Sequence, residues 1–522
     1  MSSSDLPEGL QEMSKYEDAI DRDELENTYD ELFEEMKETS MERRTLLKAF
    51  AGGGGLATLN ALFAQKKFMG DDLESGLKAI GTASDVPFGV QKVDDPPYKV
   101  DDEMYERFDA TQMDFRQEDP FGANAGNLGP PDTSHADMNY LIDNALACAG
   151  SQTQGNAPPI RMENSGESRA LIALSQAVPT PGWGVHVNRM GMDHDEALGV
   201  KGHPLAKREP DVTDPDNLRK KLNSAARLAG VADLGVAKRD DRWIYAKSEW
   251  GAEIKIGDYD EFHTVGEGED AEYHFPDKLD TVIPIAVEMP RRMGRMGYSY
   301  GGGVCSDMGY MRQSIALLML SRWIRLMGYE AIPSGNDMGP SVPTAIDGGL
   351  VQYGRHGRSI HPQFGSNIRV SKIYTDMPLE PDSYIQFGAT EFCKACKICA
   401  NECPAGQIST GERTWTYEGP GEGYSKNEGV YKWYCNSAHC MRFWGENGTN
   451  DSQCMNVCPF TQGRSKVHDF IRYLAGGPAD GTLSDMSEAF GYESYLSPGV
   501  WDEPGMSYLP YGISQDPELG TL

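Results

Sequence analysis

Residues 393–404 read C-K-A-C-K-I-C-A-N-E-C-P, and the four thiols in this stretch decide how the later part of the chain folds. Their spacing is C-x2-C-x2-C-x3-C-P, in which three closely spaced cysteines bind one 4Fe–4S cluster and the fourth binds a second one. That second cluster needs further thiols, and the chain supplies them between residues 435 and 458. The cysteines of this region are Cys393, Cys396, Cys399, Cys403, Cys435, Cys440, Cys454 and Cys458.

Two other uses of clustered cysteines fit this pattern less well. Structural zinc sites usually show two separated C-x2-C pairs, and disulfide frameworks show no proline directly after a cysteine. Here Pro404 follows Cys403 and Pro459 follows Cys458. The sequence therefore predicts that residues 386–465 form a region with two 4Fe–4S clusters.

The chain of 522 residues is strongly acidic, with a net charge of −32. This charge argues against nucleic acid and against an anionic membrane surface as direct partners, because both would repel it. The length allows two to four domains and a large buried core. The sequence has neither a G-x-G-x-x-G turn between a strand and a helix nor a P-loop, so it predicts no dinucleotide or nucleotide site.

A pair of arginines near the N-terminus resembles a twin-arginine export signal. Residues 1–42 are acidic, Arg43 and Arg44 follow, and residues 49–64 are an apolar run that contains four consecutive glycines. We therefore interpret residues 1–64 as an acidic segment plus an export signal of the kind that carries proteins already folded around their cofactors. The alternative is a basic pair before a flexible loop. The apolar run is too short and too polar to predict a transmembrane helix, so we expect membrane attachment through a partner.

Between this signal and the cysteines, several segments show helix and strand patterns. Residues 65–200 are rich in Pro, Asp, Gly and Met, which predicts a loop-rich wrapping region with short helices at 138–149 and 168–177. Helix start and stop signals at Asp214 and Gly230 enclose a helix with Leu218, Leu222 and Leu228. A continuous apolar run predicts a buried strand at 281–289, and short strands are also predicted at 234–237 and 370–375. Further apolar residues predict a long buried helix at 308–328 that includes Ile315 and Met319.

The remaining segments are polar. Residues 248–279 are acidic and are predicted to be an insertion, and residues 466–522 a C-terminal extension with a helix at 466–474 followed by coil. Residues 354–382 combine glycines with several Arg and His residues close to the cysteines, so they are a candidate functional loop, with a salt-bridged surface loop as the alternative. Helices that alternate with strands before the cysteines predict a layered α/β or α+β domain.

Several motifs follow one another in order between about residue 200 and residue 465. They are A-A-R-L-A-G-V-A-D-L-G-V-A-K-R-D-D-R-W-I-Y from Ala225, the strand that ends in V-E-M, I-H-P-Q-F-G-S-N-I-R-V-S-K-I-Y-T-D-M-P-L from Ile360, the cysteine region, and C-M-R-F-W-G from Cys440. Together with the export signal, this set resembles the catalytic subunit of corrinoid-dependent reductive dehalogenases, of the exported respiratory type.

The resemblance implies a fold and a set of cofactors. It implies a nitroreductase-like core at 201–385 that binds a cobalamin-type corrinoid in its base-off form, followed by a ferredoxin-like domain with two 4Fe–4S clusters at 386–465. Electrons would pass from an outer cluster to an inner one and then to cobalt, which would attack or reduce the carbon–halogen bond. The sequence lacks the D-x-H-x-x-G motif, so no lower His ligand to cobalt is predicted.

The resemblance also implies three catalytic residues. Tyr310 stands in the place of the proton donor, Arg369 in the basic place that holds the phenolate and the departing halide, and Asn336 in the place of a pocket asparagine. A tyrosine with a pKa of about 10 is a natural proton donor, and its anion needs a nearby cation. Without the resemblance, Tyr310 would be read as a core tyrosine with a satisfied hydroxyl, and Arg369 as a salt-bridge partner.

The second cluster departs from the family pattern, because Asp451 stands where a cysteine of C-x2-C-x3-C-P is often found. The family arrangement would assign Cys393, Cys396, Cys399 and Cys458 to the first cluster. It would assign Cys403, Cys435, Cys440 and Cys454 to the second. His439 or Asp451 as a ligand, or a 3Fe–4S centre, is the alternative. Cys148 and Cys305 are predicted to be buried packing residues.

Three functional hypotheses follow. The first is an exported reductive dehalogenase on the outer face of the cytoplasmic membrane, with a small integral-membrane anchor protein and electrons from the quinone pool or a hydrogenase-type complex. The second is a cytoplasmic corrinoid iron–sulfur enzyme of the epoxyqueuosine reductase type, which the export signal and the net charge of −32 oppose. The third is a non-catalytic electron-relay subunit, which the large region before the cysteines opposes.

Overall fold

The computed structural model describes only part of the chain. The described residues are 90–113, 195, 198, 200–205, 214–249, 251–266, 270–418, 426–447, 449–461, 475–477 and 480–489. Several predicted features lie outside them, namely the export signal, the helices at 138–149, 168–177 and 466–474, and Cys148.

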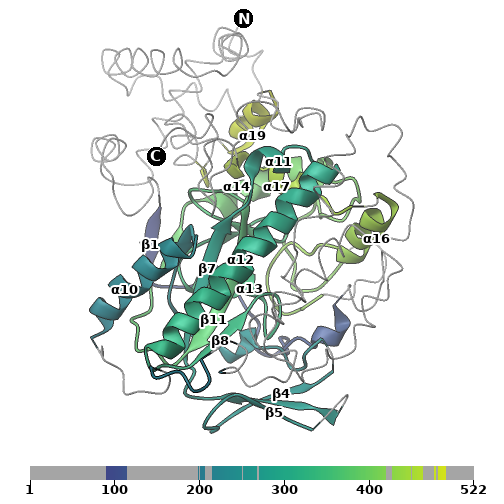
Figure 1. Cartoon of the computed structure of the whole chain (residues 1–522). Helices are drawn as coiled ribbons and strands as arrows, with labels where there is room; N and C mark the ends of the chain where they lie inside the picture. The colour runs from purple at the N-terminus through teal and green to yellow at the C-terminus, as the bar shows by residue number, and fades with distance from the viewer. Residues whose placement is uncertain are drawn as a thin grey trace, which may run out of the picture.

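An antiparallel sheet forms the centre of the described chain (Figure 1). Its strand order is β2-β7-β11-β8, and β3 also pairs with β7. The two long strands pair over their full length, from Ile368 opposite Glu288 to Thr375 opposite Thr281. The strands are β2 (Asp233–Leu234), β3 (Ala237–Lys238), β7 (Thr281–Glu288), β8 (Ala331–Ser334) and β11 (Ile368–Thr375). β7 and β11 confirm the strands predicted at 281–289 and 370–375.

The strand predicted at 234–237 is split into β2 and β3. The break falls at Gly235, where an added Cβ would lie 1.9 Å from the carbonyl oxygen of Gly348. Only a glycine allows the two backbones to approach this closely, so the strand is interrupted where the segment beyond α13 (Ser341–Asp347) crosses it.

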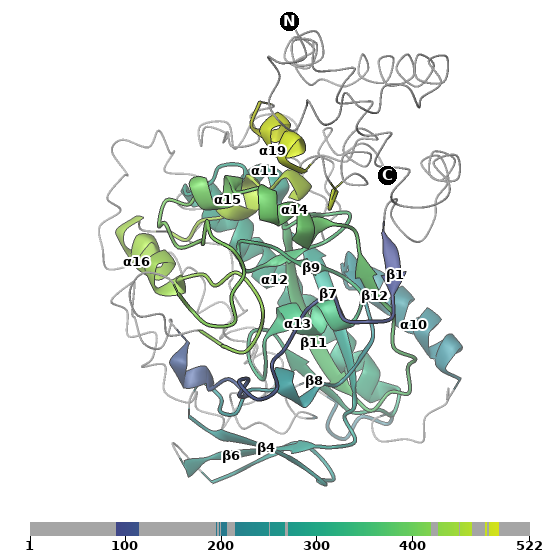
Figure 2. The same ribbon diagram turned by 180° about the vertical axis from the view of Figure 1, so that it is seen from behind.

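Helices cover both faces of the sheet. Figure 1 shows α12 (Tyr300–Leu326) in front of β7, β11 and β8, and Figure 2, from behind, shows α13 in front of the same strands. Every pair in the central sheet is antiparallel, and β4–β6 is the parallel pair among the described strands. Of the two predicted classes, the observed one is therefore α+β, and the parallel α/β alternative is wrong.

The predicted long helix is confirmed, but its bounds and its buried face differ. α12 begins at Tyr300, where the Oγ of Ser299 accepts a hydrogen bond from the N–H of Gly301 at 3.1 Å. Its buried apolar face includes Ala316, Leu320 and Ile324, which recur at helical spacing. Two residues predicted as buried are exposed, because they lie on the opposite side of the helix: Ile315 and Met319, each 42% exposed.

The helix predicted after Asp214 is also confirmed, as α10 (Pro215–Leu228), which packs against α12. Leu218 and Leu222 are fully buried, and the next residue on the same face is Ala226. Leu228 was expected to continue this face, but it lies two residues beyond Ala226 and is 77% exposed.

The predicted polar insertion forms a small sheet, which lies at the end of the central sheet (Figures 1 and 2). Its strands are β4 (Glu253–Gly257), β5 (His263–Val265) and β6 (Glu272–Pro276), in the order β4-β6-β5. Ile254, Tyr273 and Phe275 are buried, and Phe275 packs edge-on against Tyr374 of β11 with ring centroids 5.2 Å apart. Apolar side chains that alternate with charged ones thus attach the insertion to the core.

Short helices of the cysteine region gather near α11 (Arg291–Gly294) at the opposite end of the sheet (Figures 1 and 2). They are α14 (Ala389–Ala395), α15 (Ile398–Asn401) and α17 (Gln453–Asn456), together with α19 (Asp480–Ala489), which follows later in the sequence. α16 (Ser437–Asn447) lies apart from this group in both views. The coil predicted for residues after 474 is wrong at α19. This helix packs on α14, and the Oδ1 of Asp480 accepts the N–H of Gly476 at 2.9 Å.

The N-terminal segment 90–113 runs past three parts of the molecule. Its strand β1 (Gln91–Val93) pairs with β12 (Tyr384–Gln386), which precedes the cysteines. Val100 bridges Val430, and the Nη2 of Arg107 donates to the carbonyl oxygens of Tyr245 at 2.7 Å and Ile254 at 3.0 Å.

None of the helices in the described ranges is both long enough and apolar enough to cross a membrane.

Candidate active site and cysteine clusters

Three elements bring the three predicted catalytic residues together. Tyr310 lies on α12 and is only 7% exposed. Asn336 follows β8, and its Nδ2 donates a hydrogen bond to the Oη of Tyr310 at 3.2 Å. Arg369 lies on β11, and its guanidinium carbon is 4.0 Å from the centroid of the Tyr310 ring. The phenol therefore has an amide at its hydroxyl and a cation over its face.

The position of Arg369 differs in one respect from the role that the family implies. Its guanidinium lies over the face of the Tyr310 ring, and the hydroxyl takes its hydrogen bond from Asn336. Gly309 makes room for this stacking, because a Cβ there would lie 2.7 Å from the Cγ of Arg369. A cation over the ring favours the electron-rich phenolate by a cation–π interaction.

A lysine that the sequence did not single out fixes the loop of Asn336. Lys372 lies on β11 and is fully buried, and burial lowers its pKa to about 7. Its Nζ donates to the carbonyl oxygens of Gly335 at 3.1 Å and Gly339 at 2.6 Å, and to the Oγ of Ser341 at 3.1 Å. A strand lysine is usually a surface residue, so no local signal could have identified it.

Two further buried groups lie on α12 just before Tyr310. Cys305 is fully buried, as predicted, and burial raises its pKa to about 12. Asp307 is also fully buried, and burial raises the pKa of its carboxyl to about 7. The Nδ2 of Asn450 donates to the Oδ1 of Asp307 at 3.4 Å, which connects the cysteine region to the helix of Tyr310.

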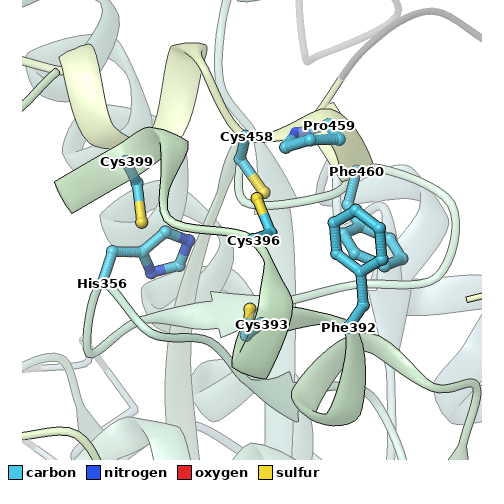
Figure 3. Close-up of a pocket in the computed structure, with 8 residues that line it drawn as sticks. All are labelled: His356, Phe392, Cys393, Cys396, Cys399, Cys458, Pro459 and Phe460. Carbon is cyan, nitrogen blue, oxygen red and sulfur yellow. The ribbon is translucent and has the colours of Figure 1, made fainter. Parts of the chain in front are cut away.

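The four thiols expected at the first cluster surround one small cavity (Figure 3). Cys393 lies on α14, Cys396 at the C-terminal end of α14, Cys399 on α15, and Cys458 directly before the 3-10 helix η9 (Pro459–Thr461). The cavity is also lined by the apolar residues Phe392, Pro459 and Phe460 and by His356. Burial raises the pKa values of Cys393 and Cys399, and that of Cys458 to about 11. No three of the described His, Cys, Asp and Glu side chains converge as ligands of one metal ion.

The four thiols expected at the second cluster also lie within electrostatic reach of one another. Cys454 interacts with Cys403 and Cys435, and Cys440 interacts with Cys403 and Cys454. Burial raises the pKa of Cys435 to about 11 and that of Cys454 to about 12, while the positive charge of Arg358 acts in the opposite direction on both. The structure thus forms two groups of four thiols, which we call the first set and the second set.

Comparisons with known proteins assign a family to this arrangement. The tetrachloroethene reductive dehalogenase of Sulfurospirillum multivorans is 33% identical over 390 residues, which cover 69% of this chain and 75% of that protein. The chain belongs to the reductive dehalogenases. These are oxidoreductases, so the reading as a non-catalytic relay subunit is wrong. A tetrachloroethene reductive dehalogenase of Desulfitobacterium hafniense is 31% identical over 307 residues, and the match spans 54% of this chain and 55% of that protein.

Solved reductive dehalogenases have a similar fold. The catabolic reductive dehalogenase NpRdhA in complex with 3-bromo-4-hydroxybenzoic acid matches with a TM-score of 0.51 and 17% identity, over 77% of this chain and 49% of that one. A reductive dehalogenase whose structure suggests a mechanism for B12-dependent dehalogenation matches with a TM-score of 0.50. This chain spans about half the length of both proteins. No protein-family model matches the chain.

In this reductive dehalogenase both oxygens of Asp451 already accept hydrogen bonds. The Oδ2 accepts from the Nε1 of Trp444 at 2.9 Å, and the Oδ1 accepts from the N–H of Gln453 at 3.1 Å. Cys435 interacts electrostatically with Cys403 and Cys454, while Asp451 acts on Cys440 and Cys454, so the hydrogen bonds of Asp451 are what distinguish the two candidates. This geometry favours Cys435 over Asp451 as the fourth ligand, and the ligand set itself stays a prediction.

Polar atoms near Tyr310 offer a test of whether a corrinoid fits this reductive dehalogenase. In the described part of the chain, the Oδ2 of Asp307, the Nε of Arg369 and the Oγ1 of Thr449 are buried without a hydrogen-bond partner. Buried polar atoms are normally paired, so these three indicate a missing polar group. Amide groups at the rim of a corrin ring can donate and accept hydrogen bonds, so the residues present fit such a cofactor.

A larger cavity of about 190 Å³ lies beside the second set. It runs between Tyr98, α13 and residues 427–432, and it reaches Gly357, where an added Cβ would lie 3.2 Å from the Sγ of Cys435. Its walls are mainly apolar, and they include the cations Arg413 and Lys432.

Proposed function

We propose that this protein removes halide from an organohalide, with a base-off B12-type corrinoid and two 4Fe–4S clusters as cofactors. The observation that carries the proposal is the Tyr310–Asn336–Arg369 contact on a core that is joined to two sets of four thiols. The balanced reaction replaces the carbon–halogen bond by a carbon–hydrogen bond. It consumes two electrons and one proton and releases one halide ion.

The residues of the chain supply and control the proton. The Oη of Tyr310 donates its proton to the carbon that loses the halide, and the resulting phenolate is later reprotonated from solvent. Asn336 keeps its N–H on the same oxygen and so stabilises the phenolate. Arg369 places a positive charge over the ring, which lowers the free energy of the anion and of the departing halide. The corrinoid, when bound, supplies the reducing cobalt centre.

The electrons would reach the corrinoid through two clusters that the two sets of thiols hold. In this proposal the first set, Cys393, Cys396, Cys399 and Cys458, holds one cluster. The second set, Cys403, Cys435, Cys440 and Cys454, holds the other. Cys399 and Cys454 interact electrostatically across the two sets, so the clusters would be neighbours between which an electron passes directly.

The finer architecture is part of the proposal. Residues 201–385 would be a nitroreductase-like core and residues 386–465 a ferredoxin-like domain. The central sheet with its covering helices in the first region, and the short helices that carry the cysteines in the second, support this division. The protein would act in organohalide respiration after twin-arginine export, on the outer face of the cytoplasmic membrane. A small membrane anchor protein would hold it there, and the quinone pool or a hydrogenase-type complex would supply electrons.

Cofactor content tests this proposal directly. Protein purified without oxygen should yield one corrinoid on extraction with acid or cyanide, and about eight irons per chain for two cubane clusters. A panel of chlorinated ethenes, ethanes and aromatics with reduced viologen should then reveal halide release. Protein that carries its iron but no corrinoid after supply of cobalamin would contradict the proposal.

Tyr310→Phe should abolish halide release without loss of cofactors. General acids typically contribute about 100- to 10,000-fold to a rate, so we expect at least a 100-fold loss in kcat at unchanged iron and corrinoid content. Tyr259→Phe, on the insertion, is the matched control, and its activity should equal that of the parent. Full activity of the Tyr310 variant would refute the role of proton donor.

A further inference from the structure

A tight turn lies between the two sets of thiols. The strands β9 (Gln352–Tyr353) and β10 (Ser359–Ile360) pair antiparallel, and the turn between them reads G-R-H-G-R over residues 354–358. The N–H of Gly354 donates to the carbonyl oxygen of Arg358 at 3.0 Å, and Gly357 has a φ of +73° that favours glycine. His356 lines the cavity of the first set, and Gly357 lies against Cys435 of the second set.

Arg355 fixes this turn to the cysteine run. It is fully buried, and its Nε donates to the carbonyl oxygens of Cys393 at 2.9 Å and Cys396 at 3.0 Å. Its Nη1 donates to the carbonyl oxygens of Ser409 and Gly411, both at 2.8 Å. The position of the turn relative to both sets is therefore set by buried hydrogen bonds, and the charge of Arg355 acts on Cys393 and Cys435 alike.

His356 presents an uncharged ring to the first set. Its Nδ1 accepts the backbone N–H of Arg358 at 3.2 Å, so this nitrogen carries no proton. Its Nε2 then carries the hydrogen and donates to the Oγ of Ser366 at 2.7 Å. A ring that accepts at one nitrogen and donates at the other is the neutral tautomer.

Arg358 presents a positive charge to the second set. Its Nη1 donates to the carbonyl oxygen of His356 at 2.8 Å, which holds the guanidinium next to the turn. Its charge interacts with the thiols of Cys454, Cys440 and Cys435, three of the four in the second set. The other charged groups that act on this set are Lys432 and Arg355, whose positive charges act in the same direction as that of Arg358, and Asp451, whose negative charge acts against them.

We propose that Arg358 raises the reduction potential of the cluster in the second set and so makes the two clusters electrochemically distinct. A cluster gains one negative charge when it takes up an electron, and a fixed cation nearby stabilises that reduced form. The first set faces the neutral His356 at the corresponding place in the turn. The cluster of the second set therefore has the higher potential of the two. The inference rests on the two clusters of the proposed function.

The test is a redox titration of the holoenzyme followed by electron paramagnetic resonance. Arg358→Gln removes the charge and keeps an N–H that can donate to the carbonyl oxygen of His356. Arg358→Lys keeps the charge. In the Gln variant the higher of the two midpoint potentials should fall, with at least a tenfold drop in the ratio of reduced to oxidised cluster at a fixed potential. For a one-electron couple this drop corresponds to about 59 mV. The lower midpoint should stay in place, and the Lys variant should resemble the parent.

Arg227→Gln is the matched control, because this exposed arginine lies on α10 and its removal changes the net charge equally. Unchanged midpoints in Arg358→Gln at full iron content would overturn the inference, as would a fall of the lower midpoint alone. The parent protein gives a second test that needs no variant, because coincident midpoints of its two clusters would also overturn the inference. A parent without two clusters would instead contradict the proposed function.

Discussion

At the scale of single residues, the second set of thiols depends on Cys435. The sequence left open whether Cys435 or Asp451 completes this set, and the structure shows Asp451 bonded through both oxygens to Trp444 and Gln453. A carboxylate that is already paired and buried would have to break these hydrogen bonds before it could bind iron.

The two candidates give opposite expectations on substitution. Cys435→Ala should reduce the iron content from about eight to about four per chain, because a cubane cluster needs its fourth ligand. Asp451→Asn should keep the full iron content, since the amide oxygen can still accept one of the two hydrogen bonds. Iron analysis of anaerobically purified protein decides the matter, and loss of iron in the Asp451 variant with retention in the Cys435 variant would reverse our assignment.

Lys372 shows how one buried cation can support a catalytic loop. Lys372→Met should lower Tm by on the order of 5–10 °C and reduce activity, because the buried carbonyl oxygens around Asn336 lose their donor. Thermal unfolding followed by circular dichroism measures the first effect. Lys278→Met is the control, since its ion pair with Glu330 lies on the surface and should contribute little. Equal Tm values for the two variants would contradict the role of Lys372.

At the scale of elements, apolar runs identified the parts that are buried on all sides. β7 and β11 lie inside the sheet between helices. In β7 the sequence shows this directly, because its burial coincides with a continuous apolar run. In β11 the polar residues Arg369, Ser371 and Lys372 interrupt the apolar pattern, so the sequence does not show how far it is buried. The small sheet of β4, β5 and β6 escaped prediction because half of its side chains, such as Glu253 and Lys255, face solvent. α19 escaped because its packing surface on α14 is built from residues that are distant in sequence.

The site was predictable to a similar degree. The cysteine spacing indicated two clusters. The family resemblance divided the thiols into two sets and indicated Tyr310, Asn336 and Arg369, which the fold brings into contact. Arg358 and Lys372 were missed as individual residues, although residues 354–382 were a candidate functional loop. Their roles depend on Cys440, Cys454 and the loop of Asn336, which tertiary folding alone places next to them.

At the scale of the whole molecule, the core and the cysteine region form one connected body. Arg355 donates hydrogen bonds that join the turn of residues 354–358 to the cysteine run. Asn450, which lies between Cys440 and Cys454 in the sequence, donates a hydrogen bond to Asp307 on α12. The helix that carries Tyr310 is therefore braced by the same region that would hold the clusters. We expect the supply of electrons and the delivery of the proton to be fixed in one geometry rather than in two independently moving parts.

The pairing of β1 with β12 has a consequence for solubility and assembly. β12 lies just before the first cysteine, and β1 occupies its hydrogen-bonding edge through the register Gln91–Gln386 to Val93–Tyr384. An uncovered edge of this kind is a template for another chain, and such edges promote aggregation and strand exchange. β1 therefore protects this edge, and a version of the protein cut after residue 93 would expose an unpaired strand edge directly before the cysteines of the first set.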